Sequence, residues 1–181
     1  KNMVISYNSS KKNQSEDSNI NTILFVPCIS FGNLSLFKLY LEQIDNEILN
    51  NVFLFAVFRN LFNIIQFYFE YLINNGFVFK NKIIENSLIL SIQQKDDDTF
   101  NYLFDKFNAT TSYGFPKLDM IDRLVIEACK NNKIKIVKKL TELILSINKN
   151  EDFSLGFICS ITRNCIEICE YLLQMNVLIC Y

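Results

Sequence analysis

The fifteen residues ACKNNKIKIVKKLTE, numbered 128–142, decide the predicted fold. They open with a small residue, Ala128, and pass through the pair Asn131-Asn132. Asparagine tolerates the left-handed backbone conformation that ends many helices. The apolar residues that follow recur at the spacing of one helix face. The stretch therefore predicts the end of one helix, a bend and the start of a second, amphipathic helix.

Four other stretches align with this one without gaps, and the five copies begin at Cys28, Ala56, Ser91, Ala128 and Ser160. Their starts are separated by 28, 35, 37 and 32 residues, which average 33. Spacing of this kind is typical of repeat proteins, in which each unit is one supersecondary motif.

Three features recur in the columns of this alignment. The first position is always small, which would let two antiparallel helices approach closely. The fifth position, at the bend, holds Gly32, Asn60, Lys95, Asn132 and Asn164. The second helix carries an apolar stripe, made of Leu36, Phe37, Tyr40 and Leu41, then Ile64, Ile65, Tyr68 and Phe69, then Thr99, Phe100, Leu103 and Phe104, then Ile136, Val137 and Leu140, and finally Ile168, Cys169, Leu172 and Leu173.

The pattern resembles the core of the ankyrin repeat, most closely the divergent arrays of A+T-rich protists and intracellular parasites. Residues 134–138 and 166–169 are similar to its second helix, and residues 32–34 to its bend. The family's Thr-Pro-Leu-His start is missing. The resemblance implies an all-α, ankyrin-like α-solenoid of about five stacked helix-turn-helix repeats with reduced β-hairpin fingers. The expected organisation is a polar leader over 1–20 and a repeat domain over 21–181, with repeats at 21–48, 49–81, 82–120, 121–152 and 153–181.

Two local departures from the repeat are expected. The second helix of the second copy runs one turn further, to Asn74, and a turn-rich stretch, 108–117, is inserted in the third copy. Residues 52–79 are apolar enough to suggest a membrane segment, but Asn63, Gln66, Glu70 and Asn74 form one polar stripe. This stripe favours a buried helix of a repeat stack over a membrane span.

Composition excludes several kinds of chemistry. The chain has no histidine, so histidine-dependent triads, zinc sites and pH switches are impossible. The net charge of −1 gives no argument for binding to nucleic acid or an anionic membrane. Six cysteines without a Cys-x-x-Cys pair fit reduced, mostly buried thiols in the cytoplasm. No enzyme activity, cofactor or small-molecule substrate is expected.

Three clusters could carry function but favour simpler interpretations. The acidic run Asp96–Asp98 could bind a cation, but it more simply starts a helix. Cys159, Cys165 and Cys169 could hold a soft metal, but they lack a fourth ligand. No metal site is therefore expected. A basic stretch predicts a solvated helix face or a patch for an acidic partner, and it comprises Lys130, Lys133, Lys135, Lys138 and Lys139.

The expected function is that of a protein–protein interaction module, a scaffold or an adaptor. A structural subunit of a large permanent assembly and a pathogen effector acting on a host protein remain alternatives. The partner-binding residues would be the exposed ones before each bend, namely Phe31, Phe58, Arg59, Gln93, Gln94, Lys130, Asn131 and Arg163. Phe31 and Arg59 would be the anchors, because aromatic and arginine side chains dominate interface energetics.

Overall fold

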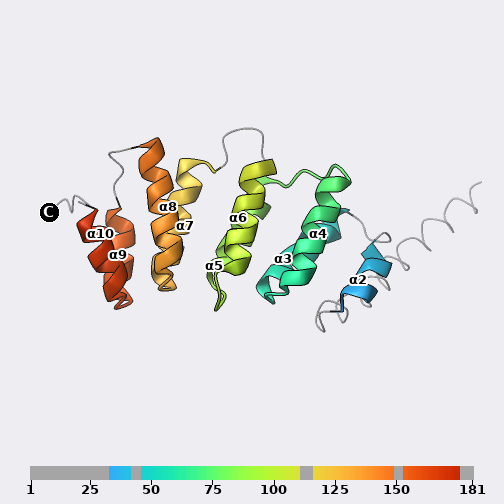
Figure 1. Cartoon of the computed structure of the whole chain (residues 1–181), viewed down its shortest axis with the longest axis horizontal. Helices are drawn as coiled ribbons and strands as arrows, with labels where there is room; N and C mark the ends of the chain where they lie inside the picture. Colours follow the sequence, from blue (N-terminus) through green and yellow to red (C-terminus); the bar gives the residue numbers. More distant parts are fainter. Residues whose placement is uncertain (1–32, 42–45, 111–115, 149–152, 176–181) are drawn as a thin grey trace, which may run out of the picture. The chain divides into compact units, whose positions relative to one another are not determined.

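The computed structural model describes residues 33–41, 46–110, 116–148 and 153–175. These ranges contain nine helices and no strand, so the predicted all-α class is confirmed for them. The helices are α2 (Leu34–Leu41), α3 (Asn46–Phe58), α4 (Phe62–Asn74), α5 (Asn81–Ile92), α6 (Asp98–Thr110), α7 (Leu118–Lys130), α8 (Ile134–Ile147), α9 (Ser154–Thr162) and α10 (Ile166–Gln174). Figure 1 shows them along the chain.

The chain divides into two compact units, residues 1–83 and 84–181, and the division falls inside α5. The predicted leader lies outside the described residues. Helices α3 and α7 begin at Asn46 and Leu118, three residues before the repeat starts predicted at 49 and 121. The repeat boundaries themselves stay predictions.

The first unit is held together by aromatic side chains between its helices. Helix α4 packs against both α3 and α2. Phe37 of α2 meets Tyr68 of α4 edge-on, with ring centroids 5.3 Å apart, and both side chains are fully buried. The Tyr68 hydroxyl donates a 2.9 Å hydrogen bond to the carbonyl oxygen of Leu49 in α3. An aromatic ring with a satisfied hydroxyl therefore joins three helices.

Residues 52–79 form two short helices with a bend between them. Helix α4 ends at Asn74, as predicted, but α6 and α8 are at least as long, so this length is not an exception. The polar stripe is confirmed, since Asn63, Glu70 and Asn74 are exposed and Gln66 is half-buried. None of the described helices is long and apolar enough to cross a membrane.

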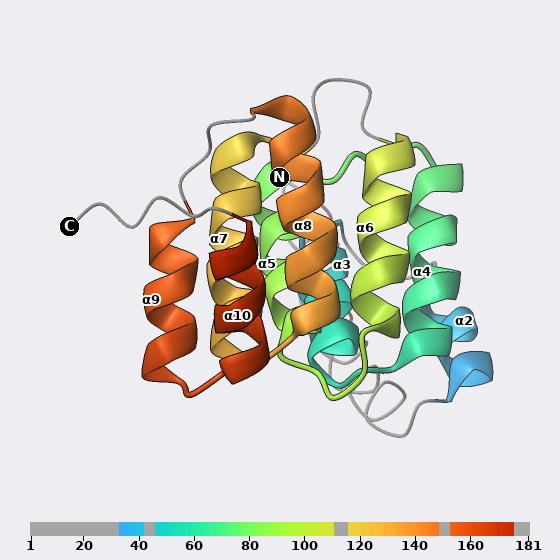
Figure 2. The same cartoon turned by 60° about the vertical axis from the view of Figure 1, so that its left-hand side comes forward.

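In the second unit, two helical hairpins pack side by side. Helices α7 and α8 form one hairpin and α9 and α10 the next, with α9 against α7 and α10 against α8 (Figures 1 and 2). Gly156 makes room for this approach, because a Cβ there would stand 3.4 Å from both Cys129 Sγ and Val125 Cγ1. Between α8 and α10, the hydroxyls of Thr141 and Tyr171 lie 2.9 Å apart.

Three of the predicted bends have the same backbone geometry. Asn60, Asn132 and Asn164 adopt φ values of 52°, 56° and 57°, in the left-handed region. In each bend, the N–H of the residue after the asparagine donates a hydrogen bond to the carbonyl oxygen of the small residue that opens the copy. The donor and acceptor are Leu61 and Ala56, Lys133 and Ala128, and Cys165 and Ser160, at 2.8–3.0 Å. This is the Schellman arrangement, which satisfies the last carbonyls of a helix. The prediction for these asparagines is confirmed.

The bend of the third copy differs. Lys95 is absent from the left-handed residues among those described, and α6 begins at Asp98, one position later than its counterparts. The main-chain N–H of Asp98 donates to the Asp96 carboxylate at 3.3 Å. A carboxylate in this position satisfies an N–H that a helix start leaves without a partner. The third copy thus enters its second helix through acidic side chains instead of an asparagine bend.

The small first column and most of the apolar stripe are buried as predicted. Ala56, Ser91, Ala128 and Ser160 are completely buried, whereas Cys28 and Gly32 lie outside the described residues. The predicted burial of the stripe is wrong for Leu36 in α2 and Leu173 in α10, whose side chains are 43% and 49% exposed. The turn-rich stretch predicted at 108–117 is wrong for residues 108–110, which belong to α6, and residues 111–115 lie outside the described ranges.

Candidate binding surface at the bends

The predicted partner-binding residues fall into both units. In the first unit, Phe58 and Arg59 are exposed at the end of α3, and Phe31 lies outside the described residues. In the second unit, Gln93, Lys130 and Arg163 are exposed, whereas Gln94 and Asn131 are half-buried. All the described residues of this set lie at the end of a first helix or within two residues after it, as predicted, but the predicted exposure is wrong for the half-buried Gln94 and Asn131.

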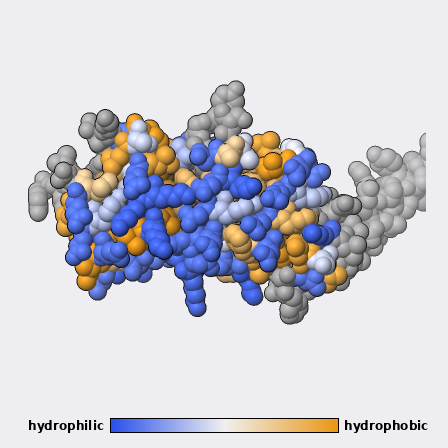
Figure 3. All heavy atoms as spheres, in the orientation of Figure 1, coloured by the Kyte–Doolittle hydropathy of each residue, from blue (hydrophilic) through white to orange (hydrophobic). Residues whose placement is uncertain are grey.

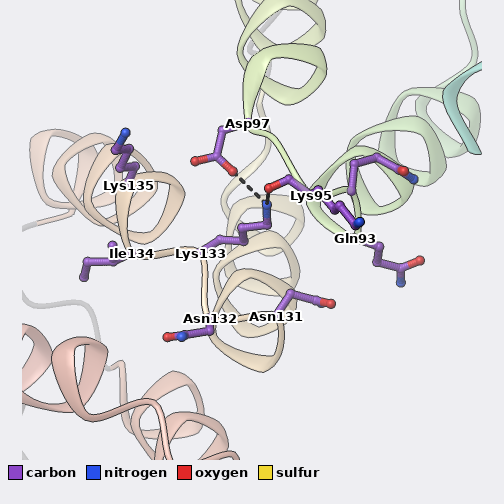
Figure 4. A pocket seen from close by; sticks show the side chains of 9 residues that line it. Gln93, Lys95, Asp97, Asn131, Asn132, Lys133, Ile134 and Lys135 are labelled. Carbon is purple, nitrogen blue, oxygen red and sulfur yellow. Dashed lines mark hydrogen bonds and ion pairs between the residues drawn. The ribbon is translucent and has the colours of Figure 1, made fainter. Parts of the chain in front are cut away.

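Three of these residues line one open cavity of about 490 Å³, which we call the bend pocket. The pocket lies between the loop that precedes α6 and the bend between α7 and α8 (Figure 4). It is lined by Gln93, Gln94, Lys95, Asp97, Asn131, Asn132, Lys133, Ile134 and Lys135. The structure therefore brings together Gln93, Gln94 and Asn131. They occupy the third and fourth positions of the copies that begin at Ser91 and Ala128.

Glu127, near the end of α7, holds one wall of the bend pocket. Its Oε1 accepts hydrogen bonds from Gln93 Nε2 at 3.0 Å and from Asn131 Nδ2 at 3.1 Å. Its Oε2 lies 3.6 Å from the amine of Lys130. Glu127 thus fixes three predicted residues at once. The alignment gave no reason to single it out, because its role depends on side chains that come from two different copies.

Lys133 forms the floor of the bend pocket. Its amine donates to the main-chain oxygen of Lys95 at 2.9 Å and lies 3.0 Å from Asp97 Oδ1 (Figure 4). Its side chain is only 13% exposed. The predicted solvated face is therefore wrong for Lys133. A lysine held by a carboxylate and a carbonyl has exchanged its hydration for fixed acceptors.

Two of the three lysines that the basic stretch places on α8, Lys138 and Lys139, also make defined contacts. Lys139 Nζ lies 2.8 Å from Asp105 Oδ1 and 5.1 Å from the centre of the Phe104 ring, which places it against α6. Lys138 lies over the ring of Tyr171 in α10. Hydrophilic side chains gather over α6 and α8 in the view of Figure 3. Three lysines of the basic stretch, Lys133, Lys138 and Lys139, therefore contact residues of neighbouring hairpins.

Residues of the acidic run and two of the cysteines make contacts within the fold. Asp97 pairs with Lys133, and Asp96 receives the N–H of Asp98. The Cys165 thiol donates to the Cys129 carbonyl oxygen at 3.5 Å, and burial raises the pKa of the Cys129 thiol to about 12. In the part of the chain that the structure describes, no group of three or more Cys, Asp or Glu side chains could hold a metal ion.

No protein-family model matches the chain, and neither curated proteins nor solved structures give a match. The fold and the site define an all-helical protein, in its described parts, whose second unit carries a polar pocket between two successive bends.

Proposed function

We propose that the chain is an ankyrin-like α-solenoid that serves as a protein–protein interaction module, a scaffold or an adaptor, without catalytic activity of its own. The partner binds along the bend side of the repeats, and the bend pocket is part of that surface. The proposed fold extends the hairpin packing seen for α7–α10 to the whole repeat region. It has about five repeats with reduced β-hairpin fingers.

Two observations support a repeated architecture. The bends at Asn60, Asn132 and Asn164 share one hydrogen-bond pattern and one backbone conformation. Contacts in the second unit also join residues about one repeat apart at two successive places, 36 residues for Lys133–Asp97 between α5–α6 and α7–α8, and 36 for Cys165–Cys129 between α7–α8 and α9–α10. Units that contact their neighbours at a fixed period are typical of solenoid proteins.

One observation carries the functional proposal. The column-matched residues Gln93, Gln94 and Asn131 line a common cavity instead of pointing to separate parts of the surface. Glu127 holds the side chains of Gln93 and Asn131, and Lys133 pairs with Asp97, so this part of the surface is organised before a partner arrives. A surface held in advance loses less conformational entropy on association, which favours binding.

Affinity capture tests this function. The full chain would be used as bait in an extract of the cells that produce it, beside the variant Gln93→Arg/Lys130→Glu. Both substituted residues are exposed, so the hairpins should still fold. The control Lys82→Glu/Lys117→Glu changes two other exposed lysines, and neither lines the bend pocket.

The wild-type chain and the control should capture the same protein, and the Gln93→Arg/Lys130→Glu variant should lose it. Equal capture by all three chains would contradict the proposal that the bends bind the partner.

A further inference from the structure

The last helical pair of the second unit, α9 and α10, has an exposed apolar face. Ile158 and Ile161 are 53% and 54% exposed and lie three positions apart on one side of α9. Ile166 and Leu173 are 63% and 49% exposed and lie seven positions apart on one side of α10. Together with the half-buried Phe157, these four side chains form a surface that we call the end face.

Residues of the end face occupy positions that are buried one repeat earlier. The fourth and fifth copies are offset by 32 residues, so three positions of the end face correspond to residues of α7 and α8, namely Phe157 to Val125, Ile161 to Cys129 and Leu173 to Thr141. The three earlier residues are at most 2% exposed. The same positions are thus covered in one hairpin and open in the next.

The earlier residues are buried because α9 and α10 pack on them. Val125 Cγ1 and Cys129 Sγ stand 3.4 Å from the place of a Cβ at Gly156 in α9. The hydroxyl of Thr141 lies 2.9 Å from that of Tyr171 in α10. The end face therefore continues the surface on which one hairpin stacks on the previous one. Contiguous apolar side chains left open in this way mark an interaction site.

The chemistry of the end face favours a partner with an identical face. All five of its side chains are hydrocarbon, so they neither repel an identical surface nor offer polar groups that a different partner would have to match. Glu170 is exposed beside the end face, at the position that Lys138 holds one repeat earlier, and its charge can stay in water at the edge of a contact. Pairing of identical patches around a two-fold axis is the commonest form of protein self-association and closes after two chains.

We propose that the end faces of two copies of the chain pack against each other, so that α9 and α10 form the interface of a two-fold dimer. Each of these helices has only nine residues, which limits the area that each copy buries. Small interfaces are typical of reversible complexes, so the expected dissociation constant is about 1–100 µM.

The dimer goes beyond the proposed function, because it gives the scaffold two partner-binding surfaces. No residue of the end face lines the bend pocket, so the contact between copies uses none of the residues of that pocket. Two linked sites hold a partner with two target segments more tightly than one site does. Capture of a partner at a single bend pocket should survive the loss of the dimer, so the two proposals can fail separately.

Sedimentation velocity of the full chain over concentrations of about 1–200 µM tests the inference. The wild-type chain should change from monomer to dimer as its concentration rises. The variant Ile161→Glu/Leu173→Glu places like charges opposite each other and should raise the dissociation constant at least about tenfold. Both residues are about half exposed, so the hairpin should still fold, which circular dichroism checks.

The matched control is Val78→Glu/Ile147→Glu, which adds the same charge at exposed apolar residues outside α9 and α10. It should dimerise with a dissociation constant within about twofold of the wild type. A wild-type chain that stays monomeric over the whole range would overturn the inference, and so would equal weakening by the two double variants.

Two further samples separate the proposed occupant of the end face from others. Ile161→Lys/Leu173→Lys should be monomeric alone but should form a dimer with the glutamate variant, because opposite charges then meet across the two-fold contact. A mixture that stays monomeric would contradict this pairing. A chain without residues 176–181, which lie outside the described residues, should dimerise as the full chain does. Dimerisation only after this truncation would mean that residues 176–181 cover the end face and would overturn the inference.

Discussion

The main-chain N–H of Lys133 donates a 2.9 Å hydrogen bond to the carbonyl oxygen of Ala128, and this bond closes the bend between α7 and α8. The same bend places the amine of Lys133 next to Asp97, in the loop before α6. One residue therefore ends a helix with its backbone and joins two hairpins with its side chain. The bend is both the element that repeats and the element that builds the pocket.

The left-handed bends give the first prediction. Asn132→Gly should leave stability nearly unchanged, whereas Asn132→Val should lower the free energy of unfolding by about 1–2 kcal/mol, because a β-branched residue is strained at positive φ. Urea denaturation followed by circular dichroism measures the difference. Lys95→Val is the matched control, since Lys95 is outside the left-handed region, and it should change stability by less than about 0.5 kcal/mol. Equal losses at the two positions would contradict the bend assignment.

The ion pair of Lys133 and Asp97 gives the second prediction. A double-mutant cycle with Lys133→Met and Asp97→Asn should yield a coupling energy of about 1 kcal/mol, because both side chains are mostly withdrawn from water, at 13% and 22% exposure. The same cycle for Lys139 and Asp105, whose side chains are 35% and 68% exposed, should give less than about 0.5 kcal/mol. Similar coupling in both cycles would show that Lys133 does not join the hairpins as described.

Tyr68 gives the third prediction. Tyr68→Phe keeps the ring and removes only the donor to the Leu49 carbonyl, so the free energy of unfolding should fall by about 1 kcal/mol. Tyr71→Phe on the same helix removes a hydroxyl from a half-buried ring and should have a smaller effect. Thermal unfolding of both variants and the wild type makes the comparison. An unchanged Tyr68→Phe variant would mean that this hydrogen bond contributes nothing to the first unit.

Cys129 gives the fourth prediction, on pH. Burial raises the pKa of its thiol in the folded state from 9.0 to about 12. The folded chain then holds this proton more tightly than the unfolded chain, and the resulting stability is fully present below pH 9 and declines as the pH rises toward 12. Unfolding free energies measured between pH 8 and pH 11 should fall less steeply for Cys129→Ala than for the wild type. Parallel curves would contradict the assigned burial.

Thiol labelling provides a second readout for Cys129. Its raised pKa and complete burial predict slow reaction with a thiol reagent at pH 8 in the folded chain. Mass spectrometry of labelled peptides should show Cys129 modified much later than the half-buried Cys159. Simultaneous modification of the two cysteines would indicate that α9 does not cover α7.

The sequence predicted the local features of the fold because each depends on a few neighbouring residues. A small residue followed after four positions by asparagine led to the bends at Asn60, Asn132 and Asn164, and the structure confirms all three. The end of α4 at Asn74 followed from periodicity alone. The apolar stripe fails in part in the first and last of the second helices, where Leu36 and Leu173 are exposed.

Parts of the site could not be read from the alignment, because they depend on side chains that meet across about one repeat. Glu127 and Lys133 reach residues 34–38 positions away in the chain. Periodicity on a single helix gives no information about such contacts, and Lys133 therefore looked like one member of a solvated face. The third bend differs for a similar reason, since the acidic residues that follow Lys95 offer a different way to start a helix.

Hydrogen exchange of the full chain, measured by mass spectrometry with and without the captured partner, tests the central claim most directly. The account predicts that binding slows exchange in residues 93–97 and 131–135, the two segments that line the bend pocket. Exchange in α10 should not change. Slowed exchange confined to other parts of the chain, with these two segments unaffected, would contradict the claim that the bends form the binding surface.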